Sequence, residues 1–200
     1  MPARRVVLAT GNAGKLGEMR AILAGHGLEV VAQSELGIQP PVEDGESFVA
    51  NALIKARHAA KIARLPAIAD DSGIEVDALG GRPGVLSARF ADGEAACNTR
   101  LLEELRDVPS SRRTARYRAV VALAFPDGRA VSADGTCEGS IGLSPRGTGG
   151  FGYDPLFVSA ELGRVVGEIG AEEKARISHR ARAMRALGAA LQARGIVASL

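Results

Sequence analysis

The stretch Ala67-Ile68-Ala69-Asp70-Asp71-Ser72-Gly73 places two adjacent acids at the end of a short apolar run. Residues 66–69 are predicted to form a buried strand that ends at the acidic pair. Because a carboxylate buried without a partner is very costly, this end should face a cleft where an acid can bind a cation or a water molecule. Successive strand side chains point to opposite faces, so Asp70 and Asp71 are not expected to play the same part. The alternative is a plain Asp-Ser-Gly turn between two strands.

The composition is typical of one soluble globular domain. The chain has 200 residues, of which 46% are hydrophobic and 24% charged, and no repeat or linker divides it, so residues 1–200 are expected to form a single domain. A net charge of +2 is too balanced for a protein that binds nucleic acid mainly through its phosphates, and no apolar run approaches the roughly 20 residues that span a bilayer. We therefore expect neither a nucleic-acid nor a membrane partner.

The two cysteines and the start of the chain bear on the compartment. Cys97 and Cys137 are far apart in sequence, so neither a redox pair nor a zinc site is indicated. The first residues lead directly into a strand-like run and lack the apolar core and cleavage site of a signal peptide. We expect a cytoplasmic protein with reduced thiols.

A glycine-containing turn near the start of the chain is a candidate phosphate site. Residues 5–9 read as a buried strand and residues 16–24 as a helix, with Thr10-Gly11-Asn12-Ala13-Gly14-Lys15 between them. Backbone N–H groups and a helix N-terminus bind phosphate in such an arrangement. Only two residues separate the glycines, so the turn is not a P-loop. Its Thr, Asn and Lys favour phosphate binding, and the alternative is a plain turn between strand and helix.

Residues 28–32 look like a second strand, and the next helix carries a lysine of interest. Ser47 is predicted to cap this helix, which runs to about Ala63. Asn51 and Lys55 are four residues apart and share a face. A helical lysine is usually solvated, but the alanine-rich surroundings indicate close packing against a sheet and favour a Lys55 that points into a cleft.

The following segments are read as a strand over 74–79, a helix over 98–106, and a hairpin of strands 117–125 and 129–137 around Asp127-Gly128. A cluster of four arginines leads into the first strand of the hairpin, and we expect it to form a solvated edge or a subunit contact: Arg112, Arg113, Arg116 and Arg118.

Two segments near the end of the chain carry candidate binding residues. Phe151 lies between glycines in a glycine-rich loop, so its ring is poorly covered by its neighbours and suits stacking on a base. The alternative is that the ring fills the core. Ser178 fits the N-cap of a last helix that ends near Ala193, which places His179 and Arg180 in the first turn. Cations there oppose the helix dipole, and an anionic or carbonyl-bearing ligand would explain their position.

Four motifs occur in a fixed order along nearly the whole chain: TGNAGK at 10–15, ADDSG at 69–73, GTGGFGYDP at 147–155 and EKARISHR at 173–180. Each motif is moderately specific, and the four together are very specific. On these motifs the chain resembles the inosine triphosphate pyrophosphatase family, enzymes that act on inosine and xanthosine triphosphates. The resemblance implies an elongated, two-lobed, mixed α/β fold with a long central mixed sheet flanked by helices and an active-site cleft between the lobes.

The resemblance further implies a homodimer and Mg²⁺-dependent hydrolysis of ITP, dITP and XTP to the monophosphate and pyrophosphate, which keeps such bases out of DNA and RNA. Asp71 would be the catalytic carboxylate and share Mg²⁺ with Glu43, and Ser72 would contact the substrate. The residues that would hold the triphosphate are Thr10, Gly11, Asn12, Ala13, Gly14, Lys15 and Lys55. The base pocket would comprise Phe151, Gly152, Tyr153, Asp154, Lys174, His179 and Arg180.

Where many relatives have an acid in the central helix, this chain has Ala50. This leaves open whether Asp70 or Glu43 alone completes the metal shell. A separate open question is whether Asp71 acts as the base or only as a metal ligand.

The chemistry of the reaction agrees with these roles. Splitting the bond between the α and β phosphates needs a nucleophilic water, and Mg²⁺ held by carboxylates both activates water and neutralises phosphate charge. Hypoxanthine and xanthine carry a 6-oxo group where adenine has an amine, so hydrogen-bond donors such as Lys174, His179 and Arg180 would reject adenine. Rejecting guanine requires that the 2-position be read.

Two alternatives remain. One is a pyrophosphatase for modified pyrimidine nucleotides on a related fold. The other is a nucleotide-sensing or RNA-binding module without hydrolysis, although the acidic pair would repel phosphate in the absence of a metal.

Overall fold

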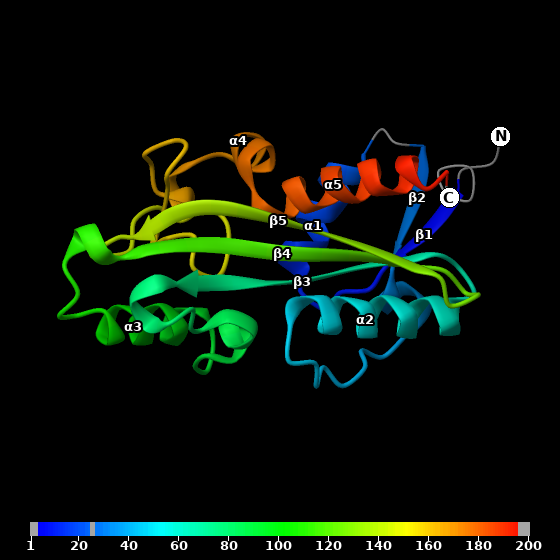
Figure 1. The fold of residues 1–200 in the computed structure, drawn as a ribbon, viewed down its shortest axis with the longest axis horizontal. Coiled ribbons are helices and arrows are strands. Elements are labelled where there is room, and N and C mark those ends of the chain that lie inside the picture. Colours follow the sequence, from blue (N-terminus) through cyan, green and yellow to red (C-terminus); the bar gives the residue numbers. More distant parts are fainter. Residues whose placement is uncertain (1–3, 25–26, 196–200) are drawn as a thin grey trace. The chain divides into compact units, whose positions relative to one another are not determined.

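The computed structural model describes residues 4–24 and 27–195 (Figure 1). The chain divides into two compact units. Unit 1 comprises Met1–Asp71, Ala119–Gly135 and Arg180–Leu200, and unit 2 comprises Ser72–Arg118 and Thr136–His179. The expectation of a single domain over residues 1–200 stays a prediction beside this division. The expectation about a signal peptide rests partly on residues 1–3, and these lie outside the described residues.

One six-stranded sheet supplies the framework, in the order β2-β1-β3-β4-β5-β6. β1 pairs in parallel with β2 and β3, whereas β5 and β6 are antiparallel. The sheet is therefore mixed and flanked by helices, which confirms the mixed α/β class. The strands are β1 (Arg4–Leu8), β2 (Leu28–Ala32), β3 (Ala67–Val76), β4 (Thr114–Ala124), β5 (Ala130–Ile141) and β6 (Phe157–Ser159).

Unit 1 holds helices on both faces of its part of the sheet: α1 (Ala13–Leu23), α2 (Phe48–Ala63), and α5 (His179–Ala193) from Arg180 onward. In Figure 1, α2 covers one face, and α1 and α5 cover the other. The core between α1, α5 and the strands contains Val6, Leu8, Met19, Leu23, Ile68, Met184, Leu187 and Leu191. The expected close packing of the alanine-rich helix α2 is also confirmed, because Phe48, Ala52, Ala56 and Ala59 are all buried.

Unit 2 has its own core around the other halves of β3, β4 and β5. It contains α3 (Glu94–Glu104) and α4 (Ala171–Ile177). Its core includes Ile74, Val76, Leu101, Leu105, Tyr117, Leu156 and Phe157.

Short 3₁₀ helices complete the fold: η1 (Gln33–Leu36), η2 (Asp77–Leu79), η3 (Gly84–Arg89), η4 (Ser110–Arg112) and η5 (Val166–Glu168).

The prediction that the strand ends at the acidic pair is wrong. β3 continues through Asp70, Asp71 and Gly73 to Val76, so the turn alternative and a separate strand over 74–79 are wrong too. Both acids are buried beside cationic side chains, which removes the need for the chain to leave the sheet. This position of the strand, Gly73, requires glycine, because an added Cβ would collide with the Gly84 carbonyl and the Ser87 hydroxyl.

Other elements differ at their ends. α3 begins at Glu94, four residues before the predicted start, and β5 continues four residues beyond the predicted end to Ile141. One of the four arginines is not solvated. Arg113 is buried, and its guanidinium donates to the carbonyls of Leu105, Val108 and Gly142, so it ties loops to the sheet. Among the described residues, none of the helices has both the length and the apolar character needed to cross a membrane.

Candidate functional site

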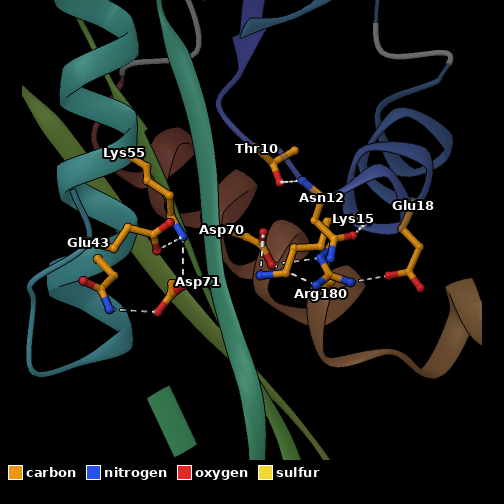
Figure 2. Close-up of polar contacts among 10 residues, drawn as sticks. Thr10, Asn12, Lys15, Glu18, Glu43, Lys55, Asp70, Asp71 and Arg180 are labelled. Atoms are coloured by element: carbon orange, nitrogen blue, oxygen red, sulfur yellow. Dashed lines mark hydrogen bonds and ion pairs between the residues drawn. The ribbon is translucent and has the colours of Figure 1, made fainter. Parts of the chain in front are cut away.

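Asp70 and Asp71 occupy neighbouring positions of β3 in unit 1, and Figure 2 shows their side chains on opposite sides of the strand. This confirms that the two acids have different surroundings, as the alternation of strand side chains predicts.

Asp70 is the centre of a buried ion network. The guanidinium of Arg180 donates to Asp70 Oδ2 through Nε at 3.0 Å and Nη2 at 2.9 Å, and its Nη1 contacts the Glu18 carboxylate. Lys15 Nζ lies 3.4 Å from Asp70 Oδ1. Asp70 and Arg180 are each 1% exposed. Burial alone would raise the pKa of Asp70, but the charges of Arg180, Lys15 and Lys55 lower it well below its ordinary value.

Asp71 faces the central helix on the other side of β3. Lys55 Nζ donates to Asp71 Oδ1 at 2.8 Å and to Glu43 Oε2 at 2.7 Å, and Asn51 Nδ2 lies 3.3 Å from Asp71 Oδ2. Burial raises the pKa of Asp71, and the charge of Lys55 opposes this rise only in part. Burial would lower the pKa of Lys55, but Asp71 and Glu43 raise it above its ordinary value, so the ammonium stays charged.

The local structure of α2 explains how Asn51 and Lys55 reach Asp71. The Ser47 hydroxyl accepts from the Ala50 N–H at 3.2 Å, so the predicted cap is confirmed, and α2 ends at Ala63 as expected. Asn51 Oδ1 also accepts from the Gly45 N–H at 2.9 Å, which ties the loop carrying Glu43 to the helix. A Cβ at Gly45 would collide with Asn51, so this close approach requires glycine.

The N-terminus of α1 forms the third part of this region. Asn12 is the N-cap, its Oδ1 accepts from the Lys15 N–H at 3.0 Å, and its own N–H donates to the Thr10 hydroxyl at 3.2 Å. Gly11, Asn12 and Ala13 are exposed. Burial lowers the pKa of Lys15, although Asp70 opposes this shift. The turn thus presents backbone N–H groups and a lysine at a helix N-terminus, which is an arrangement that can bind phosphate.

Glu43 and Asp71 are suited to a hard cation. Both carboxylates accept a hydrogen bond from the Lys55 ammonium, so they converge on one cationic group. Mg²⁺ prefers oxygen ligands and is held in nucleotide sites by one or two carboxylates together with substrate phosphates. No group of three or more His, Cys, Asp or Glu side chains able to hold a metal occurs in residues 4–24 and 27–195. Glu43 and Asp71 supply carboxylate oxygens of the kind that Mg²⁺ takes together with a triphosphate.

A second cluster of predicted residues lies in unit 2, around Asp154. Its Oδ2 accepts from Lys174 Nζ at 2.5 Å and from the Phe151 N–H at 2.8 Å. Lys174 Nζ also lies 4.5 Å from the centroid of the Phe151 ring, which is half-buried. Gly150 has φ 75°, and an added Cβ would collide with the Asp154 carboxylate, so the loop closes around this acid only with glycine there.

Neighbouring side chains complete this cluster. The Tyr117 hydroxyl donates to Asp154 Oδ1 at 3.2 Å, and the Tyr117 ring stacks on His179 with centroids 4.8 Å apart and an interplanar angle of 13°. Asn98 Nδ2 donates to the Gly152 carbonyl at 2.9 Å. The Tyr153 hydroxyl donates to the Ser87 carbonyl at 2.9 Å, which anchors the loop to η3.

The predicted residues thus form two groups. Unit 1 brings together residues 10–15, Glu43, Lys55 and Asp71, and unit 2 brings together Phe151–Asp154, Lys174 and His179. Ser72 is half-buried in β3 directly after Asp71. Arg180 was expected to contact the base, but in the structure its guanidinium contacts Asp70 and Glu18 of unit 1.

Sequence reasoning missed Glu18, Asn98 and Tyr117, which contact predicted site residues. Asn98 and Tyr117 lie in an otherwise ordinary helix and strand, and no local pattern marks them. Glu18 could have been noticed as an acid one turn after Lys15, whereas the partners of Asn98 and Tyr117 are distant in sequence.

Known proteins are similar to this chain over most of its length. Residues 6–190 match the Ham1 family. A dITP/XTP pyrophosphatase of Xylella fastidiosa is 53% identical over 189 residues, covering 92% of this chain and 95% of the relative. A dITP/XTP pyrophosphatase of Thermus thermophilus is 50% identical over 186 residues, covering 92% of this chain and 89% of the relative.

Solved structures are similar as well. The HAM1 protein from Coxiella burnetii has a TM-score of 0.85 and 39% identity, with 94% of this chain and 98% of that chain covered. A nucleoside-triphosphatase / dITP/XTP pyrophosphatase from Mycobacterium abscessus has a TM-score of 0.73 and 42% identity, with 92% and 98% covered. Since sequence and fold agree over nearly the full length of these proteins, the chain belongs to the Ham1 family.

Proposed function

We propose that this protein hydrolyses nonstandard purine nucleoside triphosphates, namely ITP, dITP and XTP, to the monophosphate and pyrophosphate. Relatives about half identical over nearly the whole chain carry the name dITP/XTP pyrophosphatase. The observation that carries the proposal for this chain is the convergence of Glu43 and Asp71 on a cation position beside Asn51, because it supplies the carboxylates that such a hydrolysis needs.

In unit 1, we assign the triphosphate to the turn of residues 10–15 and to two lysines. The exposed backbone N–H groups at the start of α1 would bind phosphate oxygens, and Lys15 and Lys55 would neutralise their charge. Lys55 contacts both Glu43 and Asp71, so we expect it to exchange part of these contacts for phosphate when substrate binds.

We propose Mg²⁺ as the cofactor, held by Glu43 and Asp71, whose carboxylate oxygens fit this ion. Bound Mg²⁺ would supply charge neutralisation at the phosphates and a more acidic water. Asp71 is buried and has a raised pKa, so its carboxylate is suited to accept a proton from a water that it orients. Asn51 contacts Asp71 Oδ2 and would fix the direction of that carboxylate. Ser72, the next residue in β3, is assigned to the substrate.

In unit 2, we assign base recognition to the cluster around Asp154. The Phe151 ring would stack on the base, and Gly152 and Tyr153 would shape the loop. Lys174 and His179 can donate to a 6-oxo group, which ITP and XTP have and ATP lacks. Asp154 is an acceptor and would be repelled by an oxo group, so we assign it to holding Lys174 and the Phe151 N–H. Arg180, which follows His179 directly and belongs to unit 1, is the third proposed donor.

The biological role follows from the substrates. Removing ITP, dITP and XTP would keep their bases out of DNA and RNA, so we propose that the protein cleanses the nucleotide pool in the cytoplasm. We also propose that it acts as a homodimer and needs no nucleic-acid or membrane partner.

Product analysis tests the proposed function. The protein is incubated with ITP, dITP, XTP, ATP, GTP, dTTP and UTP, with and without Mg²⁺. We expect pyrophosphate and monophosphate from the first three substrates, and loss of both products on chelation. Orthophosphate release would mean that a different bond is cut, a preference for dTTP or UTP would indicate a pyrimidine enzyme, and binding without turnover would indicate a nucleotide-binding module.

A further inference from the structure

Tyr117 joins two residues of the unit 2 cluster from outside the sequence motifs. It lies in β4, and its hydroxyl donates to Asp154 Oδ1 at 3.2 Å while its ring stacks on the imidazole of His179. A second ring, that of Phe157, packs against it with centroids 4.5 Å apart. Tyr117 is only 8% exposed. Its place in β4 and its contacts with two other rings hold the side chain in position.

Asp154 depends on several donors at once. Lys174 Nζ and the Phe151 N–H share Oδ2, and the Tyr117 hydroxyl binds Oδ1. The carboxylate is 2% exposed, so its position is set by these protein contacts and not by bulk water. Buried, charge-assisted hydrogen bonds of this kind are strong and directional. Tyr117 therefore fixes the rotation of the carboxylate that in turn orients Lys174.

The same ring also limits the orientation of His179. The two rings are nearly parallel, at 13°, so rotation of the imidazole about its Cβ–Cγ bond would tilt it away from the tyrosine ring and lose the stacking contact. One tyrosine thus sets the geometry of two proposed donors to the base, Lys174 through Asp154 and His179 directly.

We infer that Tyr117 is a positioning residue for base recognition, which sharpens the choice of 6-oxo over 6-amino purines by holding Asp154 and His179 in place. This inference rests on the proposed function. Discrimination between an oxo and an amino group depends on donors that cannot turn away, because a mobile donor accommodates either base.

The test compares two hydroxyl deletions in the same strand. Tyr117→Phe removes the donor to Asp154 and keeps the ring, whereas Thr114→Val removes a hydroxyl that donates to the Asp77 carboxylate at 2.6 Å. We measure kcat and KM for ITP and ATP by pyrophosphate release. Tyr117→Phe should raise KM for ITP more than it lowers kcat, and the ratio of kcat/KM for ITP to that for ATP should fall about threefold to tenfold.

Two further variants sharpen the comparison. Thr114→Val should leave the ratio at its wild-type value. Tyr117→Leu, which also removes the stacking on His179, should lower the ratio further than Tyr117→Phe does. A folded Tyr117→Phe protein whose ratio stays within about twofold of wild type would overturn the inference. The proposed function fails separately, if the wild-type protein releases no pyrophosphate from ITP or shows no preference for ITP over ATP.

The wild-type protein offers a second readout that needs no folded Tyr117 variant. The chain has three histidines, and the proton signals of His179 can be assigned by NMR from their loss in His179→Gln. Stacking on Tyr117 should shift these signals upfield, and inosine monophosphate should move them more than adenosine monophosphate does. Signals at ordinary positions, or signals that both nucleotides move equally, would contradict the inference.

Discussion

Asp70 and Asp71 are consecutive residues of β3, yet Asp70 binds Arg180 on one side of the strand and Asp71 binds Lys55 on the other (Figure 2). The alternation of strand side chains makes this division possible. Asp70 is enclosed by a guanidinium and a lysine, and its lowered pKa keeps it charged. Asp71 shares its cation with Glu43. We therefore expect the first acid to act mainly on stability and the second on catalysis.

Asp71→Asn should lower kcat for ITP about 10²–10⁴-fold, the range expected when a general base is lost. The amide keeps the size of the side chain, and its one oxygen can still accept from Lys55, so the variant should remain folded. The measurement is pyrophosphate release as a function of Mg²⁺ concentration. Recovery of the rate at high Mg²⁺ would show that Asp71 is only a metal ligand, whereas a persistent loss supports its role as the base.

Asp70→Asn should lower the free energy of unfolding by about 3 kcal/mol, because it leaves Arg180 buried with less compensating charge. Urea denaturation in the presence of a chelator measures this effect without any contribution from bound metal. Asp127→Asn is the control, since Asp127 pairs with Arg129 in an exposed hairpin turn and should matter little. If Asp70→Asn is as stable as the control but inactive, Asp70 belongs to the catalytic group.

The sequence allowed much of unit 1 to be predicted, because the signals there are local. The Ser47 cap, the alanine stripe of α2 and its end at Ala63 depend on residues within a few turns of one another. The spacing of Asn51 and Lys55 predicted a shared face, and both side chains reach Asp71.

The path of β3 could not be predicted in the same way. A strand through two acids is stable only if their partners are known, and Arg180 lies 110 residues after Asp70. The contact of Tyr117 with Asp154 spans 37 residues and leaves no local trace in the sequence. Motifs therefore identified the residues of the candidate site, whereas the side chains that position them became visible only in the fold.

Glu43→Gln should raise the Mg²⁺ concentration needed for half-maximal activity. Loss of a supporting partner costs about 10–100-fold in metal affinity, and loss of a direct ligand should cost at least as much. Asp44→Asn is the matched control, because it removes the same charge from the next, exposed residue of the loop. Chelation should abolish turnover in the wild-type protein, and added Mg²⁺ should restore it. If the Mg²⁺ concentration for half-maximal activity rises equally in both variants, the effect comes from the overall charge of the loop and Glu43 is not a specific ligand.

Gly73→Ala should destabilise the protein by about 1–3 kcal/mol, the usual cost of forcing extra atoms into a packed interior. Its Cβ would collide with the Gly84 carbonyl and the Ser87 hydroxyl, and that hydroxyl also accepts from the Ile74 N–H at 2.9 Å. Gly188→Ala in α5 is the control, because no atom lies within 4 Å of the added Cβ and alanine favours the helix. Thermal unfolding of both variants measures the difference, and equal melting temperatures would contradict the prediction.

His179→Ala and Arg180→Ala should separate recognition from stability at two adjacent positions. His179 stacks on Tyr117 and is a proposed donor to the base, so its removal should lower the preference for ITP over ATP more than it lowers turnover. Arg180 is 1% exposed and bound to Asp70 and Glu18, so its loss should lower the melting temperature first. Kinetics with ITP and ATP, measured well below each melting temperature, test both. A His179→Ala protein that loses turnover but keeps its preference would contradict the donor role, whereas a fall in preference for folded Arg180→Ala would support Arg180 as a further donor.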